Sequence, residues 1–204
     1  MKPLILGIDG RSGAGKTELA DALEQRIHAE HPELSVAVFG LDQLYRGWDG
    51  LEAGVALYTH ELLPALAQGE TVTYRDWDWS SNAPDGALGP ERTFAPGQIT
   101  IIEGFGTGAR AAREHLNSLI WLNAPELSRR DRAVGRGGEN YGPNWERWSS
   151  QEQDFTDRDR VESVADLVLD TSGPAESVQE AAYTMLRLEI STNGASSSSA
   201  QGLN

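Results

Sequence analysis

The chain has 204 residues and a formal net charge of -14 at pH 7. A chain of this length predicts one domain that can bury a core without crosslinks. It contains no cysteine, which excludes disulfides, zinc ribbons, iron–sulfur clusters and a thiol nucleophile. The acidic balance repels polyanions, so we expect no nucleic-acid partner, and any bound phosphate must be held by local geometry.

The N-terminal apolar run ends at Asp9 and leads directly into glycines, which makes it too short for the core of a signal peptide. No later run approaches the ~18 apolar residues that a membrane helix needs. We therefore expect a cytoplasmic protein with no membrane partner.

Short apolar runs alternate with helical patterns along the chain. The run at 3–9 predicts a buried strand, and 16–30 predicts a helix with one apolar stripe. Further strands are expected at 34–39, 98–103, 119–123 and 165–170, with an extended segment at 71–74. Further helices are expected near 50–67, 109–116, 125–134, 143–155 and 174–190. The stretch 80–97, which is rich in Pro, Gly and Asn, predicts an irregular excursion.

This alternation predicts an α/β fold with a mostly parallel sheet and helices on both faces. We expect one domain over residues 1–190. The segment 191–204 consists largely of Ser, Gly, Ala, Asn and Gln and has almost nothing to bury, so it predicts a disordered tail.

A phosphate-binding loop follows the first predicted strand and opens the first predicted helix. The segment 10–17 reads Gly-Arg-Ser-Gly-Ala-Gly-Lys-Thr and matches G-x-x-x-x-G-K-[ST] in full. Its glycines let backbone N–H groups surround phosphate oxygens, and the helix N-terminus adds partial positive charge. The residues expected to bind the nucleotide are Gly10, Ser12, Gly13, Ala14, Gly15, Lys16 and Thr17.

The motif also predicts ATP and Mg²⁺ as cofactors. Lys16 is expected to bridge the β- and γ-phosphates, and the Thr17 hydroxyl to ligate Mg²⁺. A metal-supporting carboxylate is needed at the end of a neighbouring strand, and Glu103 ends the apolar run 98–103. The glycines at 104–109 also fit a loose dinucleotide fingerprint, but we favour a tight turn beside the metal site.

Two classes of P-loop protein are disfavoured. GTPases need N-K-x-D, and no lysine remains to make this motif. A motor ATPase would need a longer chain. A small-molecule kinase needs a carboxylate that accepts the proton of an acceptor hydroxyl. Asp42, directly after the second predicted strand, is the candidate base, with a turn-capping aspartate as the alternative. We expect this strand to lie beside that of the phosphate loop, so that Asp42 faces the γ-phosphate from the same sheet edge.

Four arginines lie within eight residues, at 129, 130, 132 and 136. Arg132 and Arg136 are four apart and share a helical face, and the glycines after them permit movement. We interpret this segment as an Arg-rich lid over the phosphates, with Arg132 and Arg136 as catalytic cations. A solvated, salt-bridged helix is the alternative.

Together these segments resemble the uridine kinase and phosphoribulokinase branch of P-loop kinases. The resemblance spans about residues 4–172 and rests on five segments, at 7–17, 42–45, 102–104, 127–130 and 165–169. It implies the three-layer P-loop NTPase fold and phosphoryl transfer from ATP to a hydroxyl, with Asp42 as the base. The substrate contacts it implies are Tyr45, Trp77, Asp78, Trp79 and Arg129.

The chain departs from this family at two places. The histidine expected after the Trp77-Asp78-Trp79 segment is missing, with Asn82 nearby, and the family's Asp-His-Pro segment is replaced by residues 47–50. The expected partner is a small hydroxyl acceptor of nucleoside type, such as uridine or cytidine. An ATP-binding regulatory or assembly protein is the alternative, and a homo-oligomer stays open.

Overall fold

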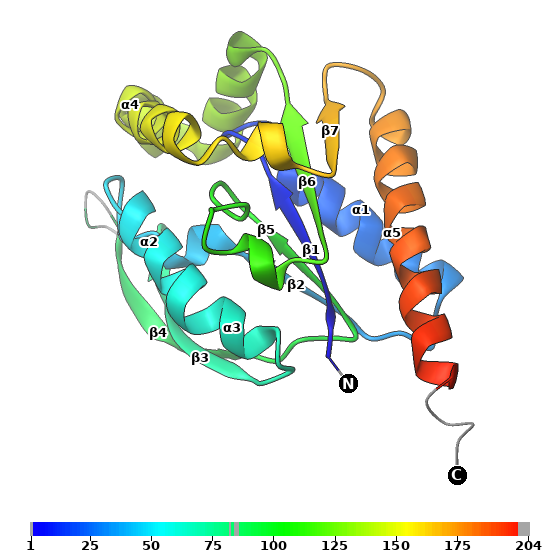
Figure 1. The fold of residues 1–204 in the computed structure, drawn as a ribbon. Coiled ribbons are helices and arrows are strands. Elements are labelled where there is room, and N and C mark those ends of the chain that lie inside the picture. Colours follow the sequence, from blue (N-terminus) through cyan, green and yellow to red (C-terminus); the bar gives the residue numbers. More distant parts are fainter. Residues whose placement is uncertain (1, 82, 84–85, 200–204) are drawn as a thin grey trace.

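A computed structural model describes residues 2–81, 83 and 86–199, without the side chains of 137–140 and 193–199. Its centre is a parallel five-stranded sheet with the strand order β2-β5-β1-β6-β7 (Figure 1). The strands are β1 (Leu4–Asp9), β2 (Val36–Gly40), β5 (Ile99–Glu103), β6 (Ser118–Asn123) and β7 (Leu167–Asp170). The expected α/β fold is confirmed.

Two helices cover one face of the sheet. The first is α1 (Lys16–Glu30), which begins directly after the phosphate loop, and the second is α5 (Ala175–Ser199). Leu19, Leu23 and Ile27 of α1 are buried against β1 and β5 together with Tyr183 and Leu186 of α5. The spacing of four in α1 therefore marks the side that packs on the sheet.

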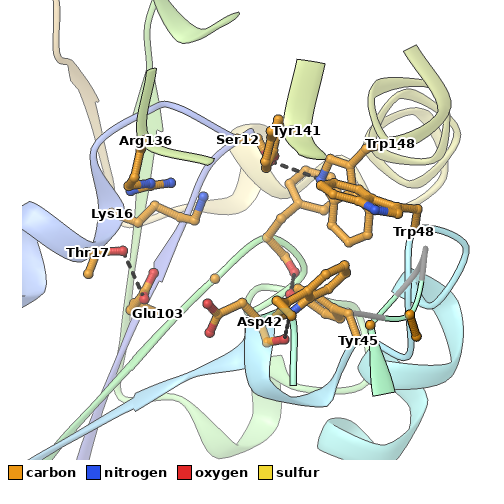
Figure 2. A pocket seen from close by; sticks show the side chains of 15 residues that line it. Ser12, Lys16, Thr17, Asp42, Tyr45, Trp48, Glu103, Arg136, Tyr141 and Trp148 are labelled. Atoms are coloured by element: carbon orange, nitrogen blue, oxygen red, sulfur yellow. Dashed lines mark hydrogen bonds between the residues drawn. The ribbon is translucent and has the colours of Figure 1, made fainter. Parts of the chain in front are cut away.

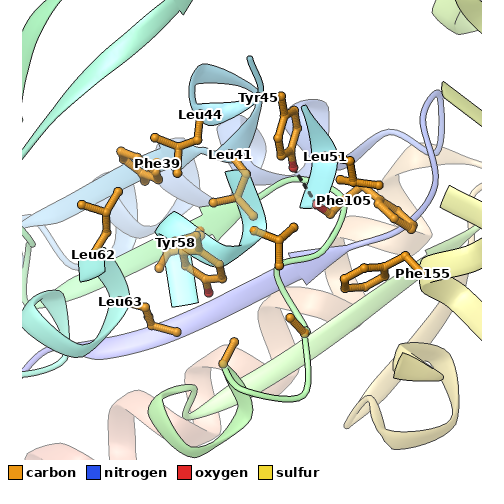
Figure 3. Packing of buried hydrophobic residues seen from close by; sticks show 14 of the residues in the cluster. Phe39, Leu41, Leu44, Tyr45, Leu51, Tyr58, Leu62, Leu63, Phe105 and Phe155 are labelled. Atoms are coloured by element: carbon orange, nitrogen blue, oxygen red, sulfur yellow. Dashed lines mark hydrogen bonds between the residues drawn. The ribbon is translucent and has the colours of Figure 1, made fainter. Parts of the chain in front are cut away.

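The other face carries a helical segment, a hairpin and a long helix. The helical segment consists of α2 (Leu51–Leu57), a π-helical turn (Tyr58–Leu62) and α3 (Leu63–Leu66), and the hairpin pairs β3 (Val72–Asp78) with β4 (Ala87–Phe94). The long helix is α4 (Glu126–Asp159). Phe39, Leu62 and Phe105 belong to the apolar core between these elements and the sheet (Figure 3).

Short 3₁₀ turns complete the fold. They lie at Leu41–Leu44, Arg113–His115 and Val161–Val164. Within the described residues, no helix combines the length and apolar character needed to cross a bilayer.

The structure corrects two of the expected elements in the middle of the chain. The segment 80–97, expected to be irregular, contains β4, which tolerates Pro90 because the hairpin has only two strands and Pro90 lacks a ladder partner there. The helix expected at 109–116 is a series of turns that ends in the short 3₁₀ turn.

The two helices expected at 125–134 and 143–155 are one helix, α4, which continues through Pro143. Ala133, Trp145, Trp148 and Phe155 are buried along it. Packing of these side chains on both sides of the proline stabilises a helix that local propensity would interrupt.

The expected tail differs in part from the structure, because α5 continues to Ser199. Leu186 is fully buried, whereas Ser191 and Thr192 are exposed and donate their hydroxyls to the carbonyls of Arg187 and Leu188. At Ser191 and Thr192, side-chain bonds to the preceding turn thus take the place of packing on the core. Residues 200–204 of the expected tail lie outside the described residues.

A buried carboxylate joins the phosphate loop to the loop after β5. Asp9, at the end of β1, is fully buried and accepts hydrogen bonds from the backbone N–H groups of Gly10, Gly106 and Gly108 at 2.7, 3.0 and 2.8 Å. Burial raises the pKa of Asp9 to about 6, although these N–H groups and Lys16 oppose the shift. The cost of burying this charge is therefore only partly offset.

We predict that Asp9 makes the free energy of unfolding fall as the pH rises. Its folded-state pKa lies above the unfolded value of 3.8, so its contribution is complete below pH 4 and is lost as the pH passes about 6. The shift corresponds to ~3 kcal/mol. Urea unfolding of the wild type and Asp9→Asn between pH 4 and 8 measures it, because the asparagine cannot ionise. Parallel stability curves for the two proteins would contradict this assignment.

Candidate active site

A cavity of about 430 Å³ opens at the carboxyl edge of the sheet, where the phosphate loop lies (Figure 2). We call it the acceptor-side cavity. Its polar side includes Lys16, Asp42 and Glu103, and its aromatic side chains come from the segment after β2, the loop after β5, the hairpin and α4. The aromatic residues are Tyr45, Trp48, Trp79, Phe105, Tyr141 and Trp148.

The phosphate loop is folded tightly against α4. Gly13 has φ +78° and a Cβ placed on it would lie 2.0 Å from the carbonyl oxygen of Arg129, so no side chain fits there. Gly15 also has a positive φ, 94°, directly before α1. The Lys16 ammonium donates to the carbonyl of Gly10 at 2.7 Å, which directs it across the loop. The sequence motif is thus present in the strand–loop–helix context that it requires.

Two oxygen donors suited to Mg²⁺ lie together beside this loop. The Thr17 hydroxyl donates to Glu103 Oε1 at 3.1 Å. Burial raises the pKa of Glu103, opposed by the nearby Lys16 charge. A hydroxyl and a carboxylate are hard ligands of the kind that Mg²⁺ takes alongside phosphates and water. This pair therefore fits the ion, and the described residues contain no larger cluster of metal-ligating side chains.

Asp42 faces the same space from another strand. We expected its strand to lie beside that of the phosphate loop, and this is wrong: β2 pairs with β5, which separates it from β1. Asp42 still reaches the cavity because it follows β2 at the same sheet edge. A Cβ on Gly40 would lie 2.9 Å from Asp42 Oδ1 and 3.3 Å from Glu103 Oε1, so both carboxylates border one small space.

A second cavity, of about 300 Å³, lies on the other side of the phosphate loop. We call it the donor-side cavity. It is lined by Gly13, Gly15, Glu18, Leu19, Arg132, Arg136, Thr171, Gly173, Ala175, Val178 and Gln179. Arg136 lines both cavities. Its side chain is 58% exposed and pairs with Glu18 at 3.6 Å, so it lies over the boundary between them.

Two further arginines of α4, Arg132 and Arg129, have different surroundings. Arg132 lines the donor-side cavity and donates to the hydroxyl and the carbonyl of Thr171 at 3.2 and 3.0 Å. Arg129 is buried and donates to the carbonyls of Ala124 and Ser12 at 3.2 and 3.3 Å. Arg129, expected to contact substrate, lines neither cavity and instead fixes α4 to the phosphate loop.

Trp77, Asp78 and Trp79 were expected to contact the substrate, and of these Trp79 lines the acceptor-side cavity. Its indole N–H donates to the carbonyl of Asp42 at 3.0 Å and so connects the hairpin to the segment after β2. Trp77 packs against Gly86, and the exposed Asp78 accepts bonds from the amide and hydroxyl of Ser80. Trp77 does not line this cavity with Trp79, because β3 ends at Asp78 and the alternation of the strand does not continue to Trp79. Asn82 lies outside the described residues.

The ring of Tyr45 lines the cavity, but its hydroxyl is used inside the protein. It donates to the carbonyl of Phe105 at 2.6 Å (Figure 3), and burial raises the pKa of Tyr45 well above its ordinary value. Any contact of Tyr45 with an acceptor is therefore made by its ring.

Sequence reasoning missed four aromatic residues of the cavity, which are Trp48, Phe105, Tyr141 and Trp148. The ring of Trp48 lies 5.0 Å from Trp79, 5.0 Å from Tyr141 and 6.3 Å from Trp148. Trp145 and Trp148, three positions apart on α4, are both buried, but Trp148 also lines the cavity. No spacing in the sequence indicates that residues 48, 141 and 148 meet.

The glycines at 104–109 form a turn whose amides have partners. The N–H groups of Gly106 and Gly108 are directed at Asp9. These two amides are thus occupied by a protein carboxylate, which opposes the dinucleotide interpretation and agrees with a tight turn beside Glu103.

Comparisons with solved structures relate this arrangement to known folds. A possible uridine kinase from Bacillus stearothermophilus is 22% identical, with a TM-score of 0.62 over 83% of this chain and 90% of that chain. Shikimate kinase from Acinetobacter baumannii, in complex with shikimate, is 13% identical, with a TM-score of 0.51 over 93% and 94%. No protein-family model and no curated protein sequence matches the chain. The structural likeness confirms the fold, which this chain shares with these two proteins.

We predict that Arg136→Ala lowers the rate of ATP consumption by about 10²-fold while the melting temperature changes little. An exposed arginine adds little stability, whereas a cation at the transferring phosphoryl group acts on the transition state. Arg130→Ala is the matched control, since Arg130 is exposed on the same helix and lines neither cavity. A loss of stability in proportion to the loss of rate would favour the salt-bridged helix.

Proposed function

We propose that the protein is an ATP-dependent kinase that transfers the γ-phosphoryl group to a hydroxyl of a small, uncharged, ring-bearing acceptor such as a nucleoside of the uridine or cytidine type. The observation that carries this proposal is the position of the phosphate loop between two cavities, with Arg136 lining both. A kinase must hold a donor and an acceptor on opposite sides of the phosphoryl group in transit.

The donor side follows from the loop. ATP would direct its phosphates to the amides of the loop and the Lys16 ammonium, and its adenosine to the donor-side cavity near Gly173 and Val178. Arg132 and Arg136 would neutralise phosphate charge from α4. Thr17 and Glu103 would hold Mg²⁺, which when bound supplies positive charge between the β- and γ-phosphate oxygens.

The acceptor side follows from the charges of its cavity. Among the described residues, the cations that line it are Lys16 and Arg136, which both border the phosphate site, and six of its other lining residues are aromatic. A carboxylate or phosphate on the acceptor would find no cation there, whereas a flat uncharged ring can stack on the indoles. This supports a nucleoside over a sugar phosphate, a nucleotide or a carboxylic acid.

Asp42 would take the proton of the acceptor hydroxyl. It is exposed to the cavity and separated from the metal ligand Glu103 by the space that Gly40 leaves open. The N–H bond from Trp79 to the carbonyl of Asp42 holds this segment under the hairpin. The base would thereby be held at the point where phosphate and acceptor meet.

The proposal is tested by measuring ADP release with nucleosides, nucleoside monophosphates, pantothenate and sugar phosphates in parallel. We expect turnover with an uncharged nucleoside and none with its 5′-monophosphate. Selective turnover of an anionic acceptor would contradict the acceptor class. Tight ATP binding without turnover of any acceptor would favour a regulatory or assembly protein.

We predict that Asp42→Asn retains ATP binding and loses about 10²- to 10⁴-fold in turnover, because asparagine has a similar shape but cannot accept the proton. ATP affinity, melting temperature and turnover are measured on one preparation. Asp49→Asn serves as the control, since Asp49 lies on the same segment and pairs with Arg147 at the surface. Near-wild-type turnover of Asp42→Asn would identify Asp42 as a turn residue, since asparagine caps as well as aspartate.

A further inference from the structure

The phosphate loop is attached to the wall of the acceptor-side cavity through Ser12 and one helix. The indole N–H of Trp148 donates to Ser12 Oγ at 2.9 Å (Figure 2), and the Tyr141 side chain lies near the same Ser12. Both aromatic rings line the cavity. Residues that would touch the acceptor therefore also hold the loop that would touch ATP.

A buried carboxylate completes this attachment. Glu152 is fully buried and accepts hydrogen bonds from the Ser12 amide at 2.8 Å and from Trp148 Nε1 at 3.0 Å. Its other oxygen pairs with Arg11 Nε at 3.1 Å. The Arg11 guanidinium also donates to the carbonyl and hydroxyl of Ser149 at 3.0 and 2.8 Å. Among the described residues, the hydrogen bonds to the Glu152 carboxylate thus come from Arg11, Ser12 and Trp148.

We infer that Trp148 is a positioning residue of the phosphate loop, acting through Ser12 and Glu152, so that the acceptor-cavity wall and the loop form one mechanical unit. This inference rests on the proposed function only for the assignment of ATP to the loop.

The physical reason is preorganisation. The bond from the Ser12 amide to Glu152 turns this amide toward α4, and the Trp148 N–H fixes the Ser12 side chain. Of the amides that follow Ser12, that of Ala14 donates to the Arg11 carbonyl at 3.0 Å. Those of Gly13, Gly15 and Lys16 can face a phosphate in a loop already ordered before ATP arrives. Without the Trp148 N–H bond, ATP binding would have to order the loop, and the affinity for ATP would be lower.

The residue Trp145 provides a matched control. It lies three positions earlier on the same helix and is buried to a similar extent, but its indole N–H has no hydrogen-bond partner among the described residues. Replacing either tryptophan by phenylalanine removes a similar amount of buried ring. Only Trp148→Phe also removes a bond to the loop.

The experiment measures the affinity of Mg·ATP by calorimetry, which requires no acceptor and no transfer. We expect Trp148→Phe to bind Mg·ATP about tenfold more weakly than the wild type and Trp145→Phe to bind it within twofold, since one hydrogen bond is worth about a factor of ten. Ser12→Ala removes the same bond from the loop side and serves if Trp148→Phe does not fold. The double variant, Trp148→Phe with Ser12→Ala, should lose no more affinity for Mg·ATP than about the larger of the two single losses.

A spectroscopic readout separates positioning from general loss of structure. In protein labelled with ¹⁵N at the indoles, the Trp148 N–H signal should shift when Mg·ATP is added, and the Trp145 signal should not. Equal weakening by the two phenylalanine variants, unchanged affinity of Trp148→Phe, or additive losses in the double variant would overturn the inference. A wild type that binds no Mg·ATP would overturn the proposed function and this inference with it, whereas a wild type that binds it leaves the variants to decide the inference alone.

Discussion

The three hydrogen bonds to the buried Asp9 carboxylate set the geometry on which the candidate site depends. They tie the first amide of the phosphate loop to the turn that follows Glu103. The parallel register of β1 and β5, which pairs Ile8 with Glu103, brings these two strand ends level. The candidate phosphate loop and the carboxylate proposed to hold Mg²⁺ thereby meet at one edge of the sheet, and their spacing is fixed by strand pairing and by one buried side chain.

At this edge of the sheet, the cations and the aromatic rings lie on different surfaces. Backbone and cations are concentrated at the loop and the start of α4, and aromatic rings are concentrated on the far wall of the acceptor-side cavity. This acidic chain contains few cations. Those that line the cavities among the described residues, Lys16, Arg132 and Arg136, lie where the phosphates are expected. Long-range attraction of anions is weak, and selectivity must come from short-range geometry.

The parts that local rules govern could be predicted from the sequence. The phosphate loop, β1 and α1 follow from a motif with its flanking apolar patterns, and the sheet follows from the alternation of strands and helices. The strand order could not be predicted in this way. The strand of Asp42 was expected beside that of the phosphate loop, but β5 lies between β2 and β1. The Asp42 side chain reaches the cavity regardless, since parallel strands end at a common edge.

The features that the sequence did not reveal depend on contacts between distant residues. β4 forms because β3 offers a partner, and α4 continues past Pro143 because tryptophans on its far side pack inward. Glu152 resembles any acidic residue of an exposed helix until the fold places it against Arg11 and Ser12, which lie about 140 positions away. Charge and spacing alone carry no signal for such a contact.

The central claim, that the loop holds the phosphates of ATP at Lys16, is tested most directly by covalent labelling with an acyl phosphate of ATP. The chain has two lysines, Lys2 and Lys16, so peptide mapping by mass spectrometry identifies the labelled site without ambiguity. Our account predicts that Lys16 is labelled and that excess Mg·ATP prevents the labelling, while Lys2 is not protected. Label at Lys2 alone, or label at Lys16 that ATP does not reduce, would contradict it.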